Sequence, residues 1–440
     1  MPETSAHIHA LRGAALTFVG DPAEIGPTAL RYESDAVIAI ANGRITHFGD
    51  ASQVLPGLAP GTPVRVIGRD RLILPGFIDC HVHYPQTQII GAHGEQLMDW
   101  LQKYTFVAEQ QFASAEHARE VARVFLDECL RAGTTSAAVY CTVHPQSADV
   151  FFEVAHARNM RMIAGKVLMD RHAPAALTDS PQGGYDESKA LIARWHGRGR
   201  QLYAVTPRFA ASSSPQQMDM AGQLWAEHPG TYLQSHVSEN RDEVAWIRKL
   251  YPERRGYLDV YDHYRQLGPR AIYGHGIWLD ESELQRMHDT GTALAHCPTS
   301  NQFLGSGALR LANARRRERP VRVGLATDVG AGTSLSMLQT LNAACMTAQA
   351  HGDRLSAADA LYLATRGAAR ALYLEDTIGS LAPGLEADLV VLDLKSTPLI
   401  EFRMRHCASL DEALFVQMTL ADDRAIEAVY VAGQLAHQRR

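Results

Sequence analysis

The residues best suited to chemistry are two histidines, His81 and His83, at the end of an apolar segment that begins at Leu74. Side chains alternate between the two faces of a β-strand, so residues two positions apart project in the same direction. On a strand, His81 and His83 therefore present two imidazoles side by side, and this pair could hold one divalent metal ion. The pattern alone leaves open a second interpretation, in which one histidine lies in the core and the other on the surface.

Further polar residues follow other segments of strand character. They are Arg208, His236 with Glu239, His275, His296 and Asp328. Three neutral histidine nitrogens with one carboxylate oxygen suit a single zinc- or iron-like ion and leave room for water. Such an ion brings the pKa of bound water to about 7, and a nearby carboxylic acid such as Glu239 could then move protons to a leaving nitrogen.

Each of these residues also has a structural interpretation. Glu239 could be a carboxylate at a helix start, and Asp328 could be a helix N-cap. Their joint occurrence at corresponding ends of successive predicted strands favours a metal-dependent active site.

Strand-like and helical segments alternate between residues 71 and 377, which is typical of an α/β fold. Counting the strand that ends at His83, eight strands are predicted, the number that closes a (β/α)8 barrel of the TIM type. The other seven are expected at residues 134–140, 162–167, 202–206, 232–236, 271–275, 292–296 and 323–328. Such barrels place their chemistry at the carboxyl ends of the strands, where the polar residues stand.

Both ends of the chain are rich in short strands. Residues 37–40 and 44–48 flank Asn42-Gly43, which is a strong hairpin pattern. Further strands are predicted at residues 387–392 and 428–431. We therefore expect a small β-sandwich domain formed by residues 1–70 and 378–440, attached to a barrel of residues 71–377.

The composition is that of an ordinary globular chain, with 46% hydrophobic and 20% charged residues. The formal net charge of -6 gives no electrostatic reason to expect binding to nucleic acid or to an anionic membrane. No apolar stretch is long enough to span a bilayer, and the N-terminal residues lack the basic start and apolar block of a secretory signal. Six scattered cysteines without a C-x-x-C pair favour reduced thiols and a cytoplasmic location.

This constellation resembles the amidohydrolase superfamily, in its branch with a single metal ion. The resemblance implies four metal ligands, which are His81, His83, His236 and Asp328. It also implies that His275 steadies the attacking or attacked group. The branch with two metal ions uses a carboxylated lysine on the fourth strand, whose end holds Arg208 here, while Lys166 lies on the third strand. One divalent ion is therefore expected, with Zn²⁺ favoured and Fe²⁺ as the alternative.

Several motifs narrow the resemblance to the guanine deaminase family. They are Pro75-Gly76-Phe77-Ile78-Asp79, His83-Tyr84-Pro85-Gln86, Trp100-Leu101 with Lys103-Tyr104-Thr105-Phe106, Thr206-Pro207-Arg208-Phe209, His236 with Ser238 to Glu243, Ala295 to Asn301, and Thr327 to Gly332. The match runs from about residue 70 to 345 and extends more weakly to both ends. One departure is Val107, where the family commonly has proline.

The resemblance also implies how a planar base is held. Guanine is rich in donors and acceptors, so its site needs a stacking surface and groups that read its edge. Phe209 offers an aromatic face, Arg208 a fixed fork of donors, and Gln86 both a donor and an acceptor. Trp100 and Leu101 are expected to shape the pocket. The remaining expected substrate contacts are His236, Glu239, His275 and Asp328.

The expected reaction is hydrolytic deamination of guanine to xanthine and ammonia. A metal-activated hydroxide would attack C2, and Glu239 would protonate the adjacent ring nitrogen and then the departing amine. Asp328 would take the remaining proton of the hydroxide. A homodimer is expected from the resemblance.

Two other functions remain open from the sequence. The first is deamination or dechlorination of another purine, a pterin or a triazine ring, although Arg208 and Gln86 favour an oxo-purine. The second belongs to a different class, a barrel without catalysis that serves as an assembly scaffold. The intact set of polar residues at the strand ends argues against it.

Overall fold

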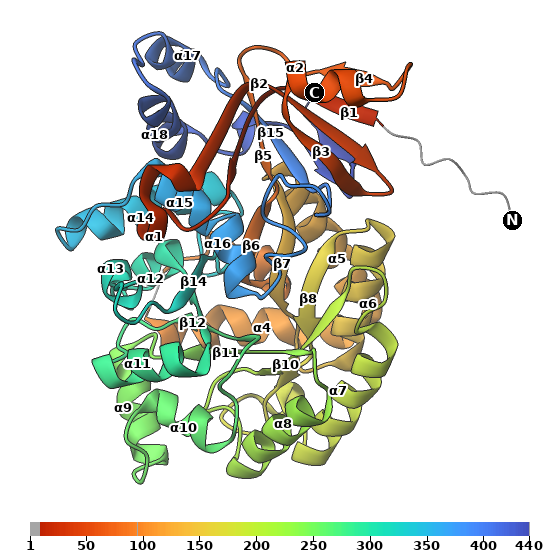
Figure 1. The fold of residues 1–440 in the computed structure, drawn as a ribbon. Coiled ribbons are helices and arrows are strands. Elements are labelled where there is room, and N and C mark those ends of the chain that lie inside the picture. The colour runs from red at the N-terminus through yellow and green to blue at the C-terminus, as the bar shows by residue number, and fades with distance from the viewer. Residues whose placement is uncertain (1–8, 95, 440) are drawn as a thin grey trace, which may run out of the picture.

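The structure is a computed structural model that describes residues 9–94 and 96–439. The prediction that the N-terminal residues form no secretory signal falls partly on residues 1–8, which lie outside the described residues. Within the described ranges the strands form two sheets, a nine-stranded one in the middle of the chain and an eight-stranded one made by both ends. Figure 1 shows the terminal sheet above the barrel, with helices around the barrel.

Eight parallel strands form the barrel in the order β14-β13-β12-β11-β10-β8-β7-β6, and the two-residue β9 (Val167–Leu168) pairs with β10. Their bounds are β6 Phe77–His83, β7 Thr134–Tyr140, β8 Arg161–Gly165, β10 Leu202–Pro207, β11 Tyr232–Val237, β12 Ala271–His275, β13 Ala293–His296 and β14 Arg322–Leu325. Their residues are nearly all buried, because helices cover a parallel barrel on the outside and side chains fill it inside. The predicted (β/α)8 barrel is confirmed.

The barrel closes between β6 and the residues that follow β14. The amide of Asp328 donates to the carbonyl of His81 at 2.9 Å, and the amide of His83 donates to the carbonyl of Val329 at 2.7 Å. The predicted strand at 323–328 ends earlier, at Leu325, and Asp328 has a φ of 51° that an extended strand does not allow. The closure holds His81, His83 and Asp328 at one edge.

The buried side chain of Asp79 reinforces this closure. It accepts hydrogen bonds from the backbone N–H of Thr327 at 3.0 Å, from the Thr327 hydroxyl, and from the backbone N–H of His81 at 3.2 Å. One carboxyl group thus ties the first strand to the segment after the last.

Several of the helices around the barrel begin at capping residues. Ser114 accepts from the N–H of His117 at the start of α5, and Asp280 forms a capping box with Glu283 at the start of α11. The helices around the barrel are α5 Ala115–Arg131, α6 Pro145–Ala157, α7 Pro181–Trp195, α8 Pro215–Glu227, α9 Arg241–Leu250, α10 Tyr257–His263, α11 Glu281–Thr290, α12 Pro298–Phe303, α13 Leu311–Ala314, α14 Met337–Ala350, α15 Ala357–Leu363 and α16 Arg366–Ala371.

Short turns replace a long helix between β6 and α5. They are η3 Tyr84–Ile89, α3 Leu97–Trp100, the π-helical turn η4 Leu101–Thr105, α4 Phe106–Glu109 and η5 Gln110–Ala113. π-helical turns occur frequently at functional sites. This segment forms one wall of the cavity described below.

The two ends of the chain build the second sheet in the order β17-β16-β15-β5-β1-β2-β3, with β4 paired to β1. The strands are β1 His9–Phe18, β2 Leu30–Ala41, β3 Arg44–Asp50, β4 Val64–Val66, β5 Arg71–Pro75, β15 Leu389–Asp393, β16 Ile426–Val431 and β17 Gln434–Gln438. β5 pairs with β15, so the ends meet as expected. The predicted hairpin is present, with positive φ at Asn42 and Gly43. The expected boundary at residue 70 falls just before β5, which belongs to this sheet.

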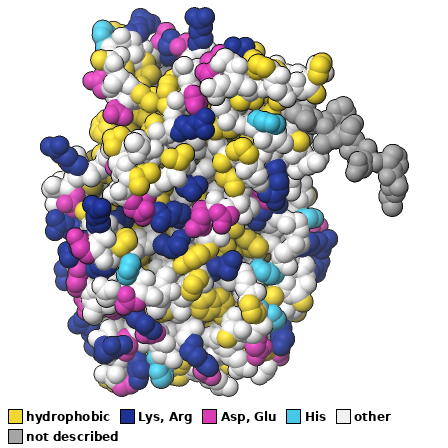
Figure 2. Space-filling view, in the orientation of Figure 1, with side chains coloured by type: hydrophobic (Ala, Val, Ile, Leu, Met, Phe, Trp, Pro, Cys, Tyr) yellow, Lys and Arg dark blue, Asp and Glu magenta, His cyan; other side chains and the backbone are white. Residues whose placement is uncertain are grey.

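Four short helices belong to the terminal segments, namely α1 Pro22–Ile25, α2 Ala51–Val54, α17 Pro398–Met404 and α18 Leu410–Leu420. α18 packs against α14 and α15. No helix within the described ranges is long and apolar enough to cross a membrane. On the face shown in Figure 2, acidic and basic side chains are interspersed rather than gathered by sign.

Candidate active site

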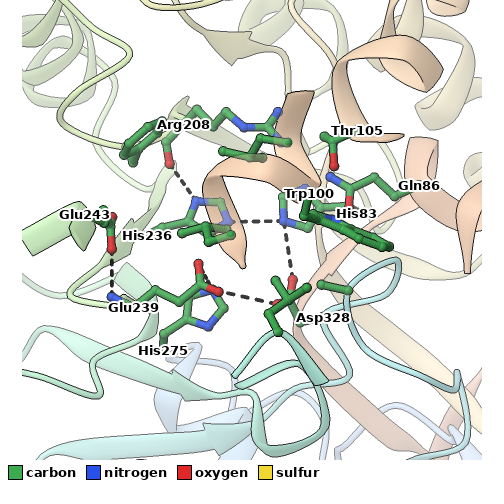
Figure 3. Close-up of a pocket in the computed structure, with 15 residues that line it drawn as sticks. His83, Gln86, Trp100, Thr105, Arg208, His236, Glu239, Glu243, His275 and Asp328 are labelled. Atoms are coloured by element: carbon green, nitrogen blue, oxygen red, sulfur yellow. Dashed lines mark hydrogen bonds and ion pairs between the residues drawn. The ribbon is translucent and has the colours of Figure 1, made fainter. Parts of the chain in front are cut away.

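A cavity lies at the carboxyl ends of the barrel strands, where barrels of this type place their chemistry. Figure 3 shows polar side chains from several strands pointing into it. The lining residues are His83, Gln86, Leu97, Trp100, Leu101, Thr105, Arg208, Phe209, His236, Glu239, Glu243, His275, Leu304, Asp328 and Ala331.

Three histidines and one aspartate converge at the floor of the cavity. The Nε2 atoms of His81 and His83 lie 3.3 and 3.5 Å from Oδ1 of Asp328. The Nε2 atom of His83 lies 3.1 Å from Nε2 of His236. Ligand atoms of His81, His83 and His236 all lie within 4.8 Å of one another. This cluster brings together the four residues expected to bind a metal.

The protonation of this cluster suits a cation. The Nδ1–H of His236 donates to the carbonyl of Arg208 at 2.6 Å, which leaves a lone pair on Nε2 of the neutral ring. Burial lowers the pKa of His81, His83 and His236, so the three rings are neutral at pH 7. Nε2 of His81 is buried and has no hydrogen-bond partner among the described residues.

Asp328 supplies the negative charge of this cluster. Burial alone would raise its pKa, but the neighbouring histidines, His81 first among them, lower it to about 2. Three neutral imidazole nitrogens and one ionised carboxylate form a donor set that fits a divalent ion such as Zn²⁺.

The backbone around the cluster is adapted to close packing. A Cβ atom at Gly274 would lie 2.7 Å from Cε1 of His81, so only glycine leaves room for this ring. His275, Asp328 and Ser238 adopt left-handed φ values of 73°, 51° and 50°. Such conformations are costly for residues with a side chain and cluster at functional sites.

Glu239 and His275 form the acid–base part of the cavity. Oε2 of Glu239 lies 3.4 Å from Nε2 of His275, and the hydroxyl of Ser306 donates to Oε1 of Glu239 at 3.1 Å. Glu239 is only 4% exposed, and this burial raises its pKa to about 7. A carboxyl group that titrates near neutral pH can both donate and accept a proton.

A hydrogen bond sets the orientation of His275. Its Nδ1 lies 2.8 Å from Oδ1 of Asn301, an acceptor, so Nδ1 carries the proton. Nε2 therefore points toward Glu239 and toward Oδ2 of Asp328, which lies 3.7 Å away. Burial lowers the pKa of His275, but the charges of Glu239 and Asp328 outweigh it and the net pKa is raised.

The opposite wall carries the residues expected to hold a base. Phe209 packs edge to face on Trp246 with ring centroids 5.9 Å apart. Trp100 and Leu101 are buried on the short turns after β6. Gln86 and Arg208 both hydrogen-bond to one buried acid, Glu109, that the sequence analysis did not single out.

His81 belongs to the cluster at the cavity floor but is not among the lining residues, whereas His296 and Lys166 lie apart from both the cluster and the lining. His296 is fully buried, and neither ring nitrogen has a hydrogen-bond partner among the described residues. Lys166 forms ion pairs with Asp179 and Glu187. Neither of them lines the cavity.

Sequence reasoning also missed supporting residues. Asn301 and Glu243 lie within two of the motifs given above, so the sequence held a signal that could have identified them. Oε2 of Glu243 accepts from the backbone N–H groups of Glu239 and Asn240 and thereby holds the turn that carries Glu239. Ser306 and Glu109 follow no strand, and no pattern identifies them.

The family model of the amidohydrolase family matches residues 72–436 of this chain. The protein therefore belongs to the amidohydrolase family. Guanine deaminase of Escherichia coli K12 is 47% identical over 435 residues, which cover 98% of each chain. The solved structure of E. coli guanine deaminase matches with a TM-score of 0.95 over 98% of this chain and 100% of that one. Within the family, the chain belongs to the guanine deaminases.

Two more distant structures carry information about ligands. A guanine deaminase from C. acetobutylicum with bound guanine in the active site is 25% identical, with a TM-score of 0.86 over 97% of this chain and 99% of that one. An adenosine deaminase from Xanthomonas campestris with bound zinc is 27% identical, with a TM-score of 0.82 over 97% and 92%.

Proposed function

We propose that this protein hydrolyses guanine to xanthine and ammonia. The observation that carries the proposal is one cavity that joins a cluster of histidines able to hold a metal ion, the carboxyl group of Glu239 and the polar pair Gln86 and Arg208. Similarity to guanine deaminases over nearly the whole chain, and to one with guanine in its active site, supports this substrate.

We infer that the cavity binds one Zn²⁺ ion, with Fe²⁺ as the alternative. The residues that would hold it are His81, His83, His236 and Asp328, whose donor atoms already converge. The zinc-bound relative from Xanthomonas campestris supports this choice. When bound, the ion supplies a Lewis acid that lowers the pKa of water to about 7.

The walls of the cavity hold the purine for attack at C2. Phe209 provides an aromatic surface for the ring, and Gln86 and Arg208 bind its polar edge. Trp100 and Leu101 exclude water from the ring. Positioning of this kind accounts for a large share of catalysis, because it removes the entropic cost of bringing the reactants together.

Proton movements are assigned to three side chains. Asp328 accepts a proton from the attacking water. Glu239 takes the other proton of the water, after donating its own proton to the ring nitrogen next to C2, and then donates a proton to the departing amine, which leaves as ammonia. The proton held by Asp328 then returns to Glu239, so that both side chains regain their starting protonation. His275, held by Asn301, donates a hydrogen bond from Nε2 to the attacked group when it is protonated, as its raised pKa favours. Guanine and water are thereby converted to xanthine and ammonia.

The test is ammonia release by the metal-replete protein from guanine, alongside adenine, a pterin and an aminotriazine. Ammonia from guanine is expected, with little or none from the other rings. Turnover of another ring in place of guanine would assign one of the alternative substrates. Bound metal without turnover of any of them would favour a scaffold.

We also propose that the protein acts as a homodimer in the cytoplasm. The relation to guanine deaminases supports the dimer. The six cysteines are free thiols, five of them buried, which supports a reducing compartment. Light scattering of the purified protein tests the dimer, and fractionation of the source cells tests the location.

A further inference from the structure

Glu109 lies behind the wall of the cavity and is only 1% exposed. It ends α4 and does not line the cavity itself. Its Oε1 accepts from Nε2 of Gln86 at 3.1 Å, and Nη1 of Arg208 donates to Oε1 and Oε2 at 3.0 and 2.7 Å. One buried carboxylate thus contacts both residues proposed to bind the substrate edge.

This contact fixes which way the amide of Gln86 faces. An ionised carboxylate only accepts hydrogen bonds, so the amide nitrogen of Gln86 must point at Glu109. The amide oxygen is then directed away from Glu109, where it accepts from the N–H of Gly330 at 3.4 Å. A carbonyl oxygen has two lone pairs, so Gln86 presents an acceptor to a ligand in the cavity.

Arg208 presents the opposite polarity. Nη1 is directed at Glu109, and the remaining N–H groups of the rigid guanidinium can only donate. Glu109 also compensates the charge of this buried cation, whose side chain is 4% exposed. The cavity wall therefore offers one acceptor and one set of donors in a fixed arrangement.

A lactam ring has the matching edge, with a ring N–H beside an exocyclic carbonyl. An aminopurine edge exchanges both groups, because the exocyclic group becomes a donor and the ring nitrogen an acceptor. When such a ring is held with its reacting carbon toward Glu239, its exocyclic amino group faces the donors of Arg208 and its ring nitrogen faces the acceptor of Gln86. Unpaired or opposed buried polar groups are costly.

We propose that Glu109 is a positioning residue that sets the hydrogen-bond polarity of Gln86 and Arg208 and thereby selects lactam rings over amino-substituted rings. The inference rests on the proposed function in that it assigns the substrate class of the same site. Glu109 acts through its two neighbours and does not contact the substrate.

Binding measurements with hypoxanthine and adenine test this inference on the metal-replete protein. Both purines lack the 2-amino group, so neither can lose ammonia at C2, and calorimetric titration gives the ratio of their dissociation constants. The unchanged protein is expected to prefer hypoxanthine. Glu109→Gln is expected to reduce this preference roughly tenfold or more, because an amide at position 109 lets Gln86 flip and leaves Arg208 without its counter-charge.

Asp179→Asn is the matched control. Asp179 also links a buried cation, Lys166, to a glutamine amide, Gln217, but it lies away from the cavity lining. This variant is expected to keep the preference for hypoxanthine. An unchanged ratio in Glu109→Gln, an equal loss in Asp179→Asn, or the lack of any preference in the unchanged protein would overturn the inference.

Glu109→Asp serves as a second variant if Glu109→Gln does not fold. It keeps a side chain that only accepts hydrogen bonds, and the preference for hypoxanthine should stay within about threefold of the original. A complete loss of this preference would overturn the role of hydrogen-bond polarity.

Ammonia release from guanine is measured in parallel. If Glu109→Gln changes the ratio of dissociation constants as expected but the unchanged protein releases no ammonia from guanine, the proposed function is refuted and the inference stands. If the protein releases ammonia but Glu109→Gln leaves the ratio unchanged, the inference is refuted and the proposed function stands.

Discussion

The Nε2 atoms of His83 and His236 lie 3.1 Å apart, although 153 positions separate the two residues in the chain. Because the Nδ1–H of His236 donates to the carbonyl of Arg208, its Nε2 carries a lone pair. Nε2 of His81 and Oδ1 of Asp328 face the same point. The proposed shared cation would satisfy all of these atoms together, and the ion would then be part of the folded structure.

Removal of the metal is therefore expected to lower stability as well as stop turnover. A ligand that binds only the native state adds about 4 kcal/mol to the free energy of unfolding when its free concentration is 1,000 times its Kd. Urea unfolding of the metal-replete protein, the chelated protein and the protein after zinc is restored measures this difference. Equal stability of the first two would contradict a structural role of the ion.

Glu239→Gln is expected to retain the metal and to lose about 10²- to 10⁴-fold in kcat, because an amide of the same shape cannot transfer the protons. Elemental analysis and ammonia release measure the two properties. Glu120→Gln, at an exposed position on α5, is the control and should leave both unchanged. A Glu239→Gln enzyme with the original kcat would exclude Glu239 as the proton donor.

Asp79→Asn is expected to weaken metal binding roughly 10- to 100-fold, although Asp79 is not a ligand. An amide replaces one acceptor with a donor and disturbs the bonds from Thr327 and His81 that hold two ligand-bearing segments together. Competition with a chelator of known affinity measures the change. Asp35→Asn, which breaks a surface pair with Arg12, should have no such effect. Equal metal affinity of the two variants would argue against the role of the Asp79 hydrogen bonds in holding the metal site.

Stability is expected to fall with acid because of His296. Burial lowers the pKa of His296 to about 3, whereas an unfolded histidine titrates near pH 6.5. Between these values the unfolded chain binds a proton that the native chain does not, so the free energy of unfolding rises with pH across this window. The contribution of this residue to stability is lost as pH falls, and the total is on the order of 5 kcal/mol.

Urea unfolding between pH 6.5 and pH 4 checks this expectation. In His296→Gln the slope of the free energy of unfolding against pH should be shallower by up to one proton. His47→Gln, which changes an exposed histidine, should keep the original slope. Parallel slopes for His296→Gln and the unchanged protein would show that His296 is protonated in the native state.

Periodicity explains why much of the fold and site could be predicted. The two-residue period of a strand places His81 and His83 on one face, and the alternation of strands and helices predicts the barrel. The Asn42-Gly43 turn predicts its hairpin because both residues tolerate positive φ.

The rest depends on contacts that no local pattern encodes. Glu109 lies among the short turns after β6, where no period holds, and its partners Gln86 and Arg208 are 23 and 99 positions away. The early end of β14 depends on the barrel closure, which redirects the backbone before Asp328. Secondary-structure propensity depends only on the local segment, whereas the position of Glu109 and the end of β14 depend on tertiary hydrogen bonds.

β5 leads directly into the strand that carries His81 and His83, and it is bound in turn to β15, where Leu389 pairs with Pro75. A nascent chain therefore has no partner for β5 on this side until residues 389–393 have left the ribosome. Translation that stops before Leu389 yields a barrel whose leading strand lacks this support. The order of synthesis is thus expected to delay maturation of the active site until β15 has been made.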